Sequence, residues 1–343
     1  MKQCFMMSVF TLAAMLVSGC GASEQNEPVQ PGKPTFHALR AANWEDLLHA
    51  SCTLYVTNYP FGSGVLLGVD QPKGPPKICL LTAAHVAISV MENAKESFYV
   101  ETFGPDGRLS AFFETRMKDG KCIPLLPSDL FAIDVTEDIQ RFARKHGRLS
   151  TEYISLNAPN QSAKPDNNWW CGVLRYADFA KHDIRLGTPC KWLGSNLWMW
   201  RRFEDKRESS LCLFDGSIAA LPKSKSYLSP HQVLTNSFNV FATTVNCIHG
   251  MSGGPVFAMG KTEDGREYPY LIGIGVSQMI SDVAPLVAYK GSFNTMTNFP
   301  AFTNRVVRFP HTDNDKGSYV CPLDPFLDFL SKSSSQKVTS SPY

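Results

Sequence analysis

The stretch Gly250-Met251-Ser252-Gly253-Gly254-Pro255-Val256 places a serine in a glycine-rich turn, directly before an apolar run. Glycine accepts the left-handed backbone that a tight turn needs, and such a turn can aim several backbone N–H groups at one point. Two other stretches precede it in the chain, Leu81-Thr82-Ala83-Ala84-His85-Val86 and Ser128-Asp129-Leu130-Phe131-Ala132-Ile133. A histidine, an aspartate and a serine therefore follow one another in that order.

The sequences Leu-Thr-Ala-Ala-His at 81–85 and Gly-x-Ser-Gly-Gly-Pro at 250–255 resemble the histidine and serine motifs of the trypsin/chymotrypsin family. A serine hydroxyl is a poor nucleophile until an imidazole takes its proton, and the same imidazole then protonates the leaving amine. The resemblance implies that Ser252 is the nucleophile and that His85 is the general acid and base.

A carboxylate must hold the other imidazole nitrogen in such a triad. The family places its aspartate before an apolar run, and Asp129-Leu130-Phe131-Ala132-Ile133 loosely matches this pattern. Asp134, at the other end of the same strand-like run, is the alternative. An odd separation of five positions puts the two carboxylates on opposite faces of a strand.

The glycine-rich turn has a chemical purpose in the family, because its amides stabilise the developing oxyanion. By resemblance these are the amides of Gly250 and Ser252. Digestive members carry an aspartate just before the serine, which pairs with a newly cut N-terminus, whereas this chain has Met251 there. We therefore expect a protein that needs no such activating cleavage.

Substrate recognition is expected at three places. Asn246, six residues before Ser252, stands where the family often sets the base of its primary pocket, and its neutral side chain gives no support to a preference for Arg or Lys. Residues 270–278 should form the strand along which an extended substrate pairs its backbone. His249 either contacts substrate or fills a loop, and we favour the loop.

Short β-like runs dominate the chain. Cys52, Leu54 and Val56 alternate with more polar neighbours, which is the period-two pattern of a half-buried strand. Strands separated by Gly/Pro turns, with little helix, favour antiparallel barrels or a sandwich. Together with the family resemblance over roughly residues 50–330, they predict an all-β, chymotrypsin-like fold of two antiparallel six-stranded β-barrels with a few short helices.

The chain divides into six expected parts. These are a lipoprotein signal peptide (1–19), a flexible tether (20–40), an N-terminal barrel (41–150), a connection or insertion (151–185), a C-terminal barrel (186–330) and a disordered tail (331–343). The interval from Asp129 to Ser252 is longer than in compact members of the family, which indicates an insertion within 136–185. One clear helix is expected from Thr136 to Gly147.

The first twenty residues have the form of an export signal, with Lys2 followed by a short apolar run. Val17-Ser18-Gly19-Cys20 resembles the lipobox of bacterial lipoproteins, which implies cleavage before Cys20 and lipid attachment to its sulfur. The alternative is an ordinary secretory signal with a chance cysteine. We expect a protein anchored by its N-terminal lipid in the bacterial cell envelope, facing the periplasm or exterior.

Composition narrows the choice of partners. The formal net charge is +2, so the chain lacks the dense basic face that nucleic acid requires. No pair of cysteines has Cys-x-x-Cys spacing, and no structural metal and no cofactor are expected. The eight cysteines beyond Cys4 and Cys20 permit disulfides without establishing them. We expect a monomer.

The leading hypothesis is a serine endopeptidase acting on proteins or peptides through an acyl-enzyme. Two alternatives stay open: a lipid-anchored, catalytically silent pseudoprotease that binds peptides, and a hydrolase of esters or another acyl substrate. An α/β-hydrolase is disfavoured because its serine comes first in the chain.

Overall fold

The structure is a computed structural model that describes sixteen segments of the chain. They are residues 35–41, 44–56, 59–69, 74–88, 97–103, 109–117, 121–125, 128–147, 150–156, 169–195, 211–221, 240–248, 250–278, 292–294, 299–301 and 317–338. The predicted signal peptide and Cys20 lie outside these residues.

The first half of the chain forms a sheet whose main path is antiparallel. In spatial order its strands are β7 (Leu109–Arg116), β6 (Ser97–Phe103), β3 (Ser51–Val56), β4 (Tyr59–Val69), β5 (Lys77–Ala83), β9 (Leu130–Asp134) and β8 (Cys122–Pro124). Two further strands branch from β4 by parallel pairing, β10 (Ser150–Ser155) and then β1 (Thr35–Ala38).

The second half forms a sheet that closes on itself. Its strands are β17 (Glu267–Gln278), β16 (Pro255–Lys261), β13 (Pro189–Ser195), β14 (Leu211–Ala220), β15 (Phe241–Thr243) and β20 (Ser318–Pro322). Because β20 pairs with both β15 and β17, these strands make a closed six-stranded ring. A short strand, β12 (Gly172–Val173), adds to β17 in parallel.

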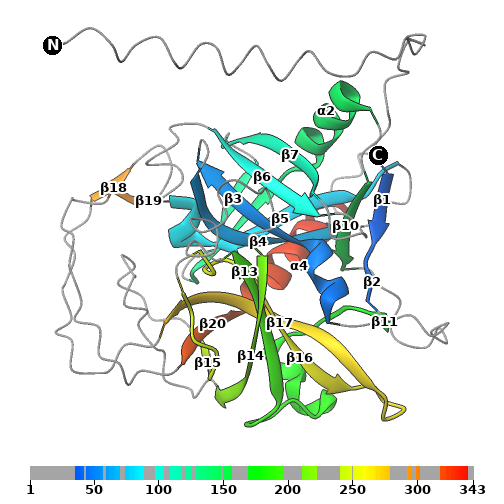
Figure 1. The fold of residues 1–343 in the computed structure, drawn as a ribbon, viewed down its shortest axis with the longest axis vertical. Helices are drawn as coiled ribbons and strands as arrows, with labels where there is room; N and C mark the ends of the chain where they lie inside the picture. Colours follow the sequence, from blue (N-terminus) through cyan, green and yellow to red (C-terminus); the bar gives the residue numbers. More distant parts are fainter. Residues whose placement is uncertain are drawn as a thin grey trace, which may run out of the picture.

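The predicted fold class, a chymotrypsin-like pair of β-barrels, is confirmed. Figure 1 shows the two sheets one above the other, with helix α4 (Asp324–Val338) near the middle of the view. The first sheet departs from the prediction in detail, because among the described residues it is an open half-barrel with a path of seven strands. Sequence periodicity shows which residues of a strand alternate between its two faces, but not which edge strands pair. It therefore could not predict whether this sheet closes into a barrel.

Two small ladders complete the β structure. One joins β2 (Arg40–Ala41) to β11 (Trp169–Trp170), and the other joins β18 (Ser292–Asn294) to β19 (Phe299–Ala301). The expected tether over 20–40 is wrong at its end, because residues 35–38 form β1 against β10. That strand is stabilised by distant backbone partners that the local sequence does not reveal.

The predicted half-buried strand at 52–57 is more buried than expected. Thr53 on its polar side is fully buried, as are Cys52 and Leu54 on its apolar side. The reason is that β3 contacts β13 and β14 of the second sheet, as well as its own sheet neighbours. Both faces of this strand are therefore covered, and the two sheets share one continuous apolar core.

Five helical segments occur among the described residues. They are η1 (Glu45–Ala50), a turn of helix over 84–88, α2 (Thr136–His146), η2 (Tyr176–His182) and α4. The predicted helix at 136–147 is confirmed as α2, with Gly147 at positive φ just after its end. A disordered tail is expected from residue 331 onward, whereas α4 continues to Val338. Within the described part of the chain, no helix has the length and apolar character needed to cross a membrane.

Candidate active site

His85 and Asp129 are brought together by the pairing of β5 with β9. Ala83 is the register partner of Leu130, so the chain leaves β5 just where Asp129 enters β9. The Ala84 amide donates to the Asp129 carbonyl (3.1 Å), and the His85 amide donates to Asp129 Oδ1 (2.9 Å). His85 Nδ1 lies 2.7 Å from Asp129 Oδ2. The carboxylate thus holds both the backbone and the ring of the histidine.

The pair is sheltered on the carboxylate side and accessible on the histidine side. The Asp129 side chain is 6% exposed, whereas the His85 side chain is 22% exposed. The fully buried Cys321 at the end of β20 lies beside Asp129; burial, and then the Asp129 charge, raise the pKa of its thiol well above the ordinary range. Such burial strengthens a contact between an imidazole and a carboxylate, because little water competes for it.

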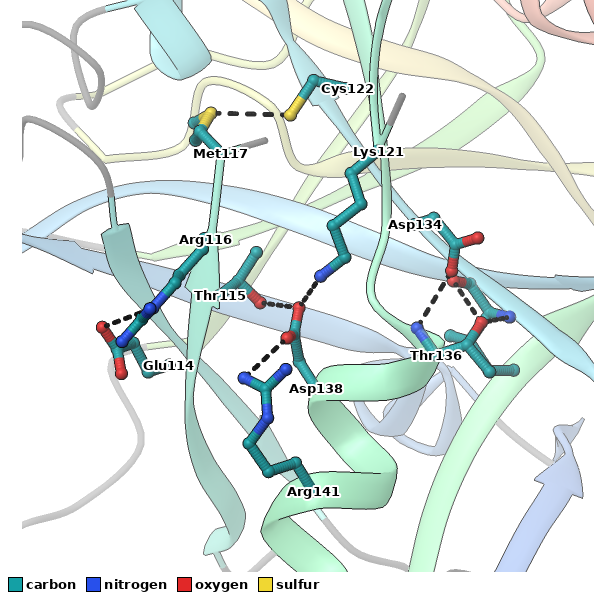
Figure 2. A network of polar contacts seen from close by, with 11 residues as sticks. Glu114, Thr115, Arg116, Met117, Lys121, Cys122, Asp134, Thr136, Asp138 and Arg141 are labelled. Atoms are coloured by element: carbon teal, nitrogen blue, oxygen red, sulfur yellow. Dashed lines mark hydrogen bonds and ion pairs between the residues drawn. The ribbon is translucent and has the colours of Figure 1, made fainter. Parts of the chain in front are cut away.

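Asp134, the alternative acid, contacts Thr136 and Lys77. Its Oδ1 accepts a hydrogen bond from the Thr136 amide (3.1 Å), and its Oδ2 lies 3.1 Å from Lys77 Nζ. Figure 2 shows Asp134 at the start of α2 beside Thr136, and next to them the buried Asp138, whose carboxylate meets Thr115, Lys121 and Arg141. These contacts fix the end of β9 that is farther from His85.

The serine turn has the glycine-dependent backbone that its sequence predicts. Gly250 has φ 95° and Gly253 has φ 87°, both in the left-handed region that side chains disfavour. A Cβ on Gly253 would lie 2.2 Å from both the Ser63 carbonyl oxygen and Thr82 Oγ1. Gly253 is therefore required both for its backbone conformation and for the close approach of the turn to the first sheet.

Ser63 and Thr82 bind the turn to the strand that leads to His85. The Ser63 amide donates to the Ser252 carbonyl (2.9 Å), and Ser63 Oγ donates to the Gly250 carbonyl (2.6 Å). Thr82 Oγ1 donates to the Ser63 carbonyl (2.7 Å), three residues before His85. Hydrogen bonds thus connect the serine turn, through Ser63, to the strand that precedes His85.

The hydroxyl of Ser252 contacts the second sheet. Its Oγ donates to the carbonyl of Val276 in β17 (3.3 Å), and the side chain is partly exposed. Cys247 lies next to it: burial raises the pKa of the Cys247 thiol to about 12, opposed by a hydrogen bond with the Ser252 side chain. A thiol with so high a pKa stays protonated at neutral pH and does not compete as a nucleophile.

The structure shows less about the other residues that the sequence predicts for the site. Asn246 is exposed, one residue before the buried Cys247. His249 and the lipid-bearing Cys20 lie outside the described residues. Residues 273–278 of β17 pair with β20 on one side, and Val276 faces Ser252 on the other. Asn246 and the substrate strand at 270–278 stay predictions.

Sequence reasoning missed four residues that shape the site: Ser63, Thr82, Cys247 and Trp192. All four are buried, and Trp192 Nε1 donates to the Met251 carbonyl (3.1 Å). Ser63 and Thr82 are polar residues inside apolar strands, which is a signal of a buried hydrogen-bond partner. Trp192 carries no such signal, because a core tryptophan is common.

Metal-ligating side chains do not gather in the described residues: no group of three or more His, Cys, Asp or Glu could hold an ion there. His85 and Asp129 instead contact each other directly, and the turn that carries Ser252 is hydrogen-bonded to Ser63.

Comparison with known proteins finds similar structures but no similar sequences. The sequence matches no protein-family profile, and no curated protein matches it. A serine-to-alanine variant of the HtrA-type protease AlgW with a tripeptide has 15% identity and a TM-score of 0.39; the match covers 83% of this chain and 60% of that one. AlgW with a decapeptide has 14% identity and a TM-score of 0.39, with coverage of 83% and 64%.

An inactive form of a serine-to-alanine mutant of Rv3671c from M. tuberculosis has 12% identity and a TM-score of 0.40, with coverage of 87% and 91%. The present chain thus spans less than two thirds of the AlgW chains that it matches. Strand order and closure of the second sheet define the fold class independently of these likenesses.

Proposed function

We propose that this protein is a serine endopeptidase that cleaves peptide bonds through an acyl-enzyme. Ser252 Oγ attacks the substrate carbonyl carbon while His85 takes its proton, and the same proton then goes to the leaving amine as the carbon–nitrogen bond breaks. Water, activated by His85, attacks the acyl carbon and releases Ser252. Asp129 keeps the imidazole oriented and stabilises its charged form.

The observation that supports this proposal is the contact of 2.7 Å between His85 Nδ1 and Asp129 Oδ2. With Nδ1 bound to a buried carboxylate, the proton on that nitrogen is fixed and Nε2 becomes the base. The serine turn is hydrogen-bonded to Ser63 in β4, and Ser63 in turn is hydrogen-bonded to Thr82 in β5, three residues before His85. This connection between the two sheets supports a triad of His85, Asp129 and Ser252 at their junction.

In this proposal the amides of Gly250 and Ser252 receive the oxyanion of the tetrahedral intermediate. One such donor is typically worth about 10² to 10³ in kcat. The substrate would add its backbone to residues 276–278 of β17, with Asn246 near its primary side chain. A protein or peptide substrate fits this mode because main-chain groups supply most of the recognition.

The direct test is labelling with a fluorophosphonate, which reacts with activated serines. Protein lacking residues 1–20 should be labelled, and peptide mapping should find the adduct on Ser252. Ser252→Ala and His85→Ala should both abolish labelling while keeping the circular dichroism spectrum and melting temperature of the parent. An adduct on another residue, or equal labelling of Ser252→Ala, would disprove the assignment.

One observation favours the second candidate, a peptide-binding pseudoprotease. The Ser252 hydroxyl has a single proton, and it donates to the Val276 carbonyl at 3.3 Å. A serine held in this way would be silent if the contact persisted. Well-folded protein that takes no label yet binds unfolded polypeptide would support this candidate over the endopeptidase.

We further propose that Cys20 carries the lipid that holds the protein on a membrane of the bacterial envelope. Several acyl chains give stable anchoring, whereas one chain gives only marginal binding. Cells expressing the full chain should incorporate labelled palmitate into the protein, and Cys20→Ser should abolish both the label and membrane fractionation. Equal labelling of the variant would exclude Cys20 as the lipid site.

A further inference from the structure

The carbonyl group of Met251, directly before the serine, is held by two hydrogen bonds. The Gly254 amide donates to it at 3.0 Å and the indole Nε1 of Trp192 donates at 3.1 Å. The first bond closes the turn locally, and the second comes from 59 residues away in the sequence. Only the second ties the orientation of this peptide group to the barrel.

Trp192 is fixed in the middle of β13. Its register partners are Phe214 on β14 and Val256 on β16, and the residue is fully buried. The ring lies against the backbone of Gly275, where a Cβ would come within 1.7 Å of the ring. An indole enclosed in this way cannot turn its N–H elsewhere without disturbing the packing of β17.

The direction of the Met251 carbonyl determines the direction of the next amide. A trans peptide group is planar, so its N–H points opposite to its C=O. Because the Met251 carbonyl points at the Trp192 indole, the Ser252 N–H points away from that indole. In the proposed mechanism the Ser252 amide is one of the two donors to the oxyanion.

The side chain of Met251 supplies no charge that could hold the turn. It is fully buried, and its Sδ accepts a hydrogen bond from the Ile248 amide (3.3 Å). β13 also approaches the turn at Gly194, where a Cβ would lie 2.8 Å from the Met251 Cα. The turn is therefore held by the strand beside it, through contacts that exist as soon as the second barrel folds.

We propose that Trp192 is a positioning residue, whose indole N–H fixes the Ser252 amide in the orientation that an oxyanion requires. The donor site is then formed on folding, without a separate activating event. The catalytic part of this inference rests on the proposed function, whereas the structural part, orientation of the Ser252 amide by the indole, does not.

The test removes the indole N–H of Trp192. Incorporating β-(3-benzothienyl)alanine at position 192 exchanges the N–H for sulfur at nearly constant shape, and Trp192→Phe is the genetically simpler variant. Phe179→Leu is the matched control, because Phe179 is buried in the same apolar cluster as Trp192. It should lower the melting temperature without changing the turn.

Loss of the N–H should lower kcat about 10- to 100-fold, less than deletion of an oxyanion donor. KM should change by less than about threefold, since ground-state binding does not use this donor. The pKa values of the pH–rate profile should stay unchanged, because the His85–Asp129 contact is intact. The control should keep kcat within about twofold.

A measurement that needs no activity separates the two proposals. In ¹⁵N-labelled protein, the backbone amide resonance of Ser252 should shift when the indole N–H is removed and should stay in place in Phe179→Leu. If the resonance shifts but Ser252 of the wild-type protein does not react with the fluorophosphonate, the positioning role of Trp192 stands and the proposed endopeptidase is overturned. An unmoved Ser252 resonance, or kcat within twofold of wild type in an active enzyme, would overturn the role of Trp192.

Discussion

Ser63 Oγ donates a hydrogen bond of 2.6 Å to the carbonyl oxygen of Gly250, 187 residues further along the chain. Ser63 Oγ also accepts a hydrogen bond from the Ser195 amide (2.7 Å) at the end of β13. One fully buried hydroxyl of the first sheet thus joins the serine turn to the second sheet. The relative position of His85 and Ser252 depends on such contacts, because each residue belongs to a different half of the chain.

Ser63→Ala should therefore impair both stability and catalysis. Its methyl group leaves the Gly250 carbonyl and the Ser195 amide without this partner in a buried site, and each unsatisfied group costs about 1–3 kcal/mol. We expect the free energy of unfolding, measured in urea, to fall by about 2 kcal/mol or more. The fluorophosphonate labelling rate should fall together with it.

Ser217→Ala is the control for Ser63→Ala. Ser217 also lies on a strand, but its hydroxyl is only 3.4 Å from Thr244 Oγ1 at the surface. Removing it should change the free energy of unfolding by no more than about 0.5 kcal/mol. If the two variants proved equally stable, Ser63 would have no special role at the junction of the sheets.

Asp129→Asn and Asp134→Asn should behave very differently. In Asp129→Asn the retained oxygen can still accept from the His85 amide, but the new NH₂ group faces Nδ1 and selects the wrong tautomer. Loss of a triad carboxylate in this way typically costs about 10⁴ in kcat. Asp134→Asn should keep kcat within about twofold. Steady-state kinetics with one fluorogenic peptide would decide, and a large loss in Asp134→Asn alone would exclude Asp129 as the triad acid.

The sequence predicts those parts of the candidate site that lie in local motifs. His85 and Ser252 stand in short stretches whose residue types are tied to their chemistry, and the strand at 130–134 begins directly after Asp129. Which of Asp129 and Asp134 contacts His85 could be seen only from the pairing of β5 with β9. A single strand defines two faces, but only its neighbours determine which end meets the histidine.

The contacts between the sheets were beyond sequence reasoning for the same reason. Trp192 and Met251 are 59 residues apart, and Ser63 and Gly250 are 187 residues apart. No local pattern of polarity links them. The parallel addition of β10 to β4 was missed likewise, because an apolar run does not reveal its partner strand.

The stability of the protein should depend on pH through Asp134. Burial alone would raise the pKa of this carboxyl, but hydrogen bonds from Thr136 and the charge of Lys77 outweigh it, so the pKa lies below its ordinary value of 3.8. A lowered native pKa means that the ionised carboxylate stabilises the fold above the unfolded pKa, and that this contribution disappears as the pH falls through the native pKa.

Melting temperatures of wild type and Asp134→Asn should therefore differ at pH 7 and converge between about pH 4 and pH 2. The difference should correspond to less than about 1 kcal/mol, because Lys77 is well exposed and solvent screens the pair. In the Lys77→Gln background, Asp134→Asn should lower the melting temperature at pH 7 by a smaller amount. A difference that grew on acidification would contradict a lowered pKa.

The eight cysteines beyond residue 20 should all be thiols of low reactivity. None of these eight described cysteines forms a disulfide bond in the structure, and among them Cys79, Cys122 and Cys212 are partly exposed. Burial raises the pKa of Cys79 and of Cys190 to about 12, so these thiols are protonated near pH 8 and thiol reagents react slowly with them.

Denatured protein lacking residues 1–20 should react with eight equivalents of a disulfide reagent such as DTNB without prior reduction. Native protein should react fastest at Cys122 and Cys212, and Cys122→Ser and Cys212→Ser should remove that fast phase. Fewer than eight equivalents in the denaturant would reveal a disulfide and require a different arrangement of the strands that carry the two cysteines.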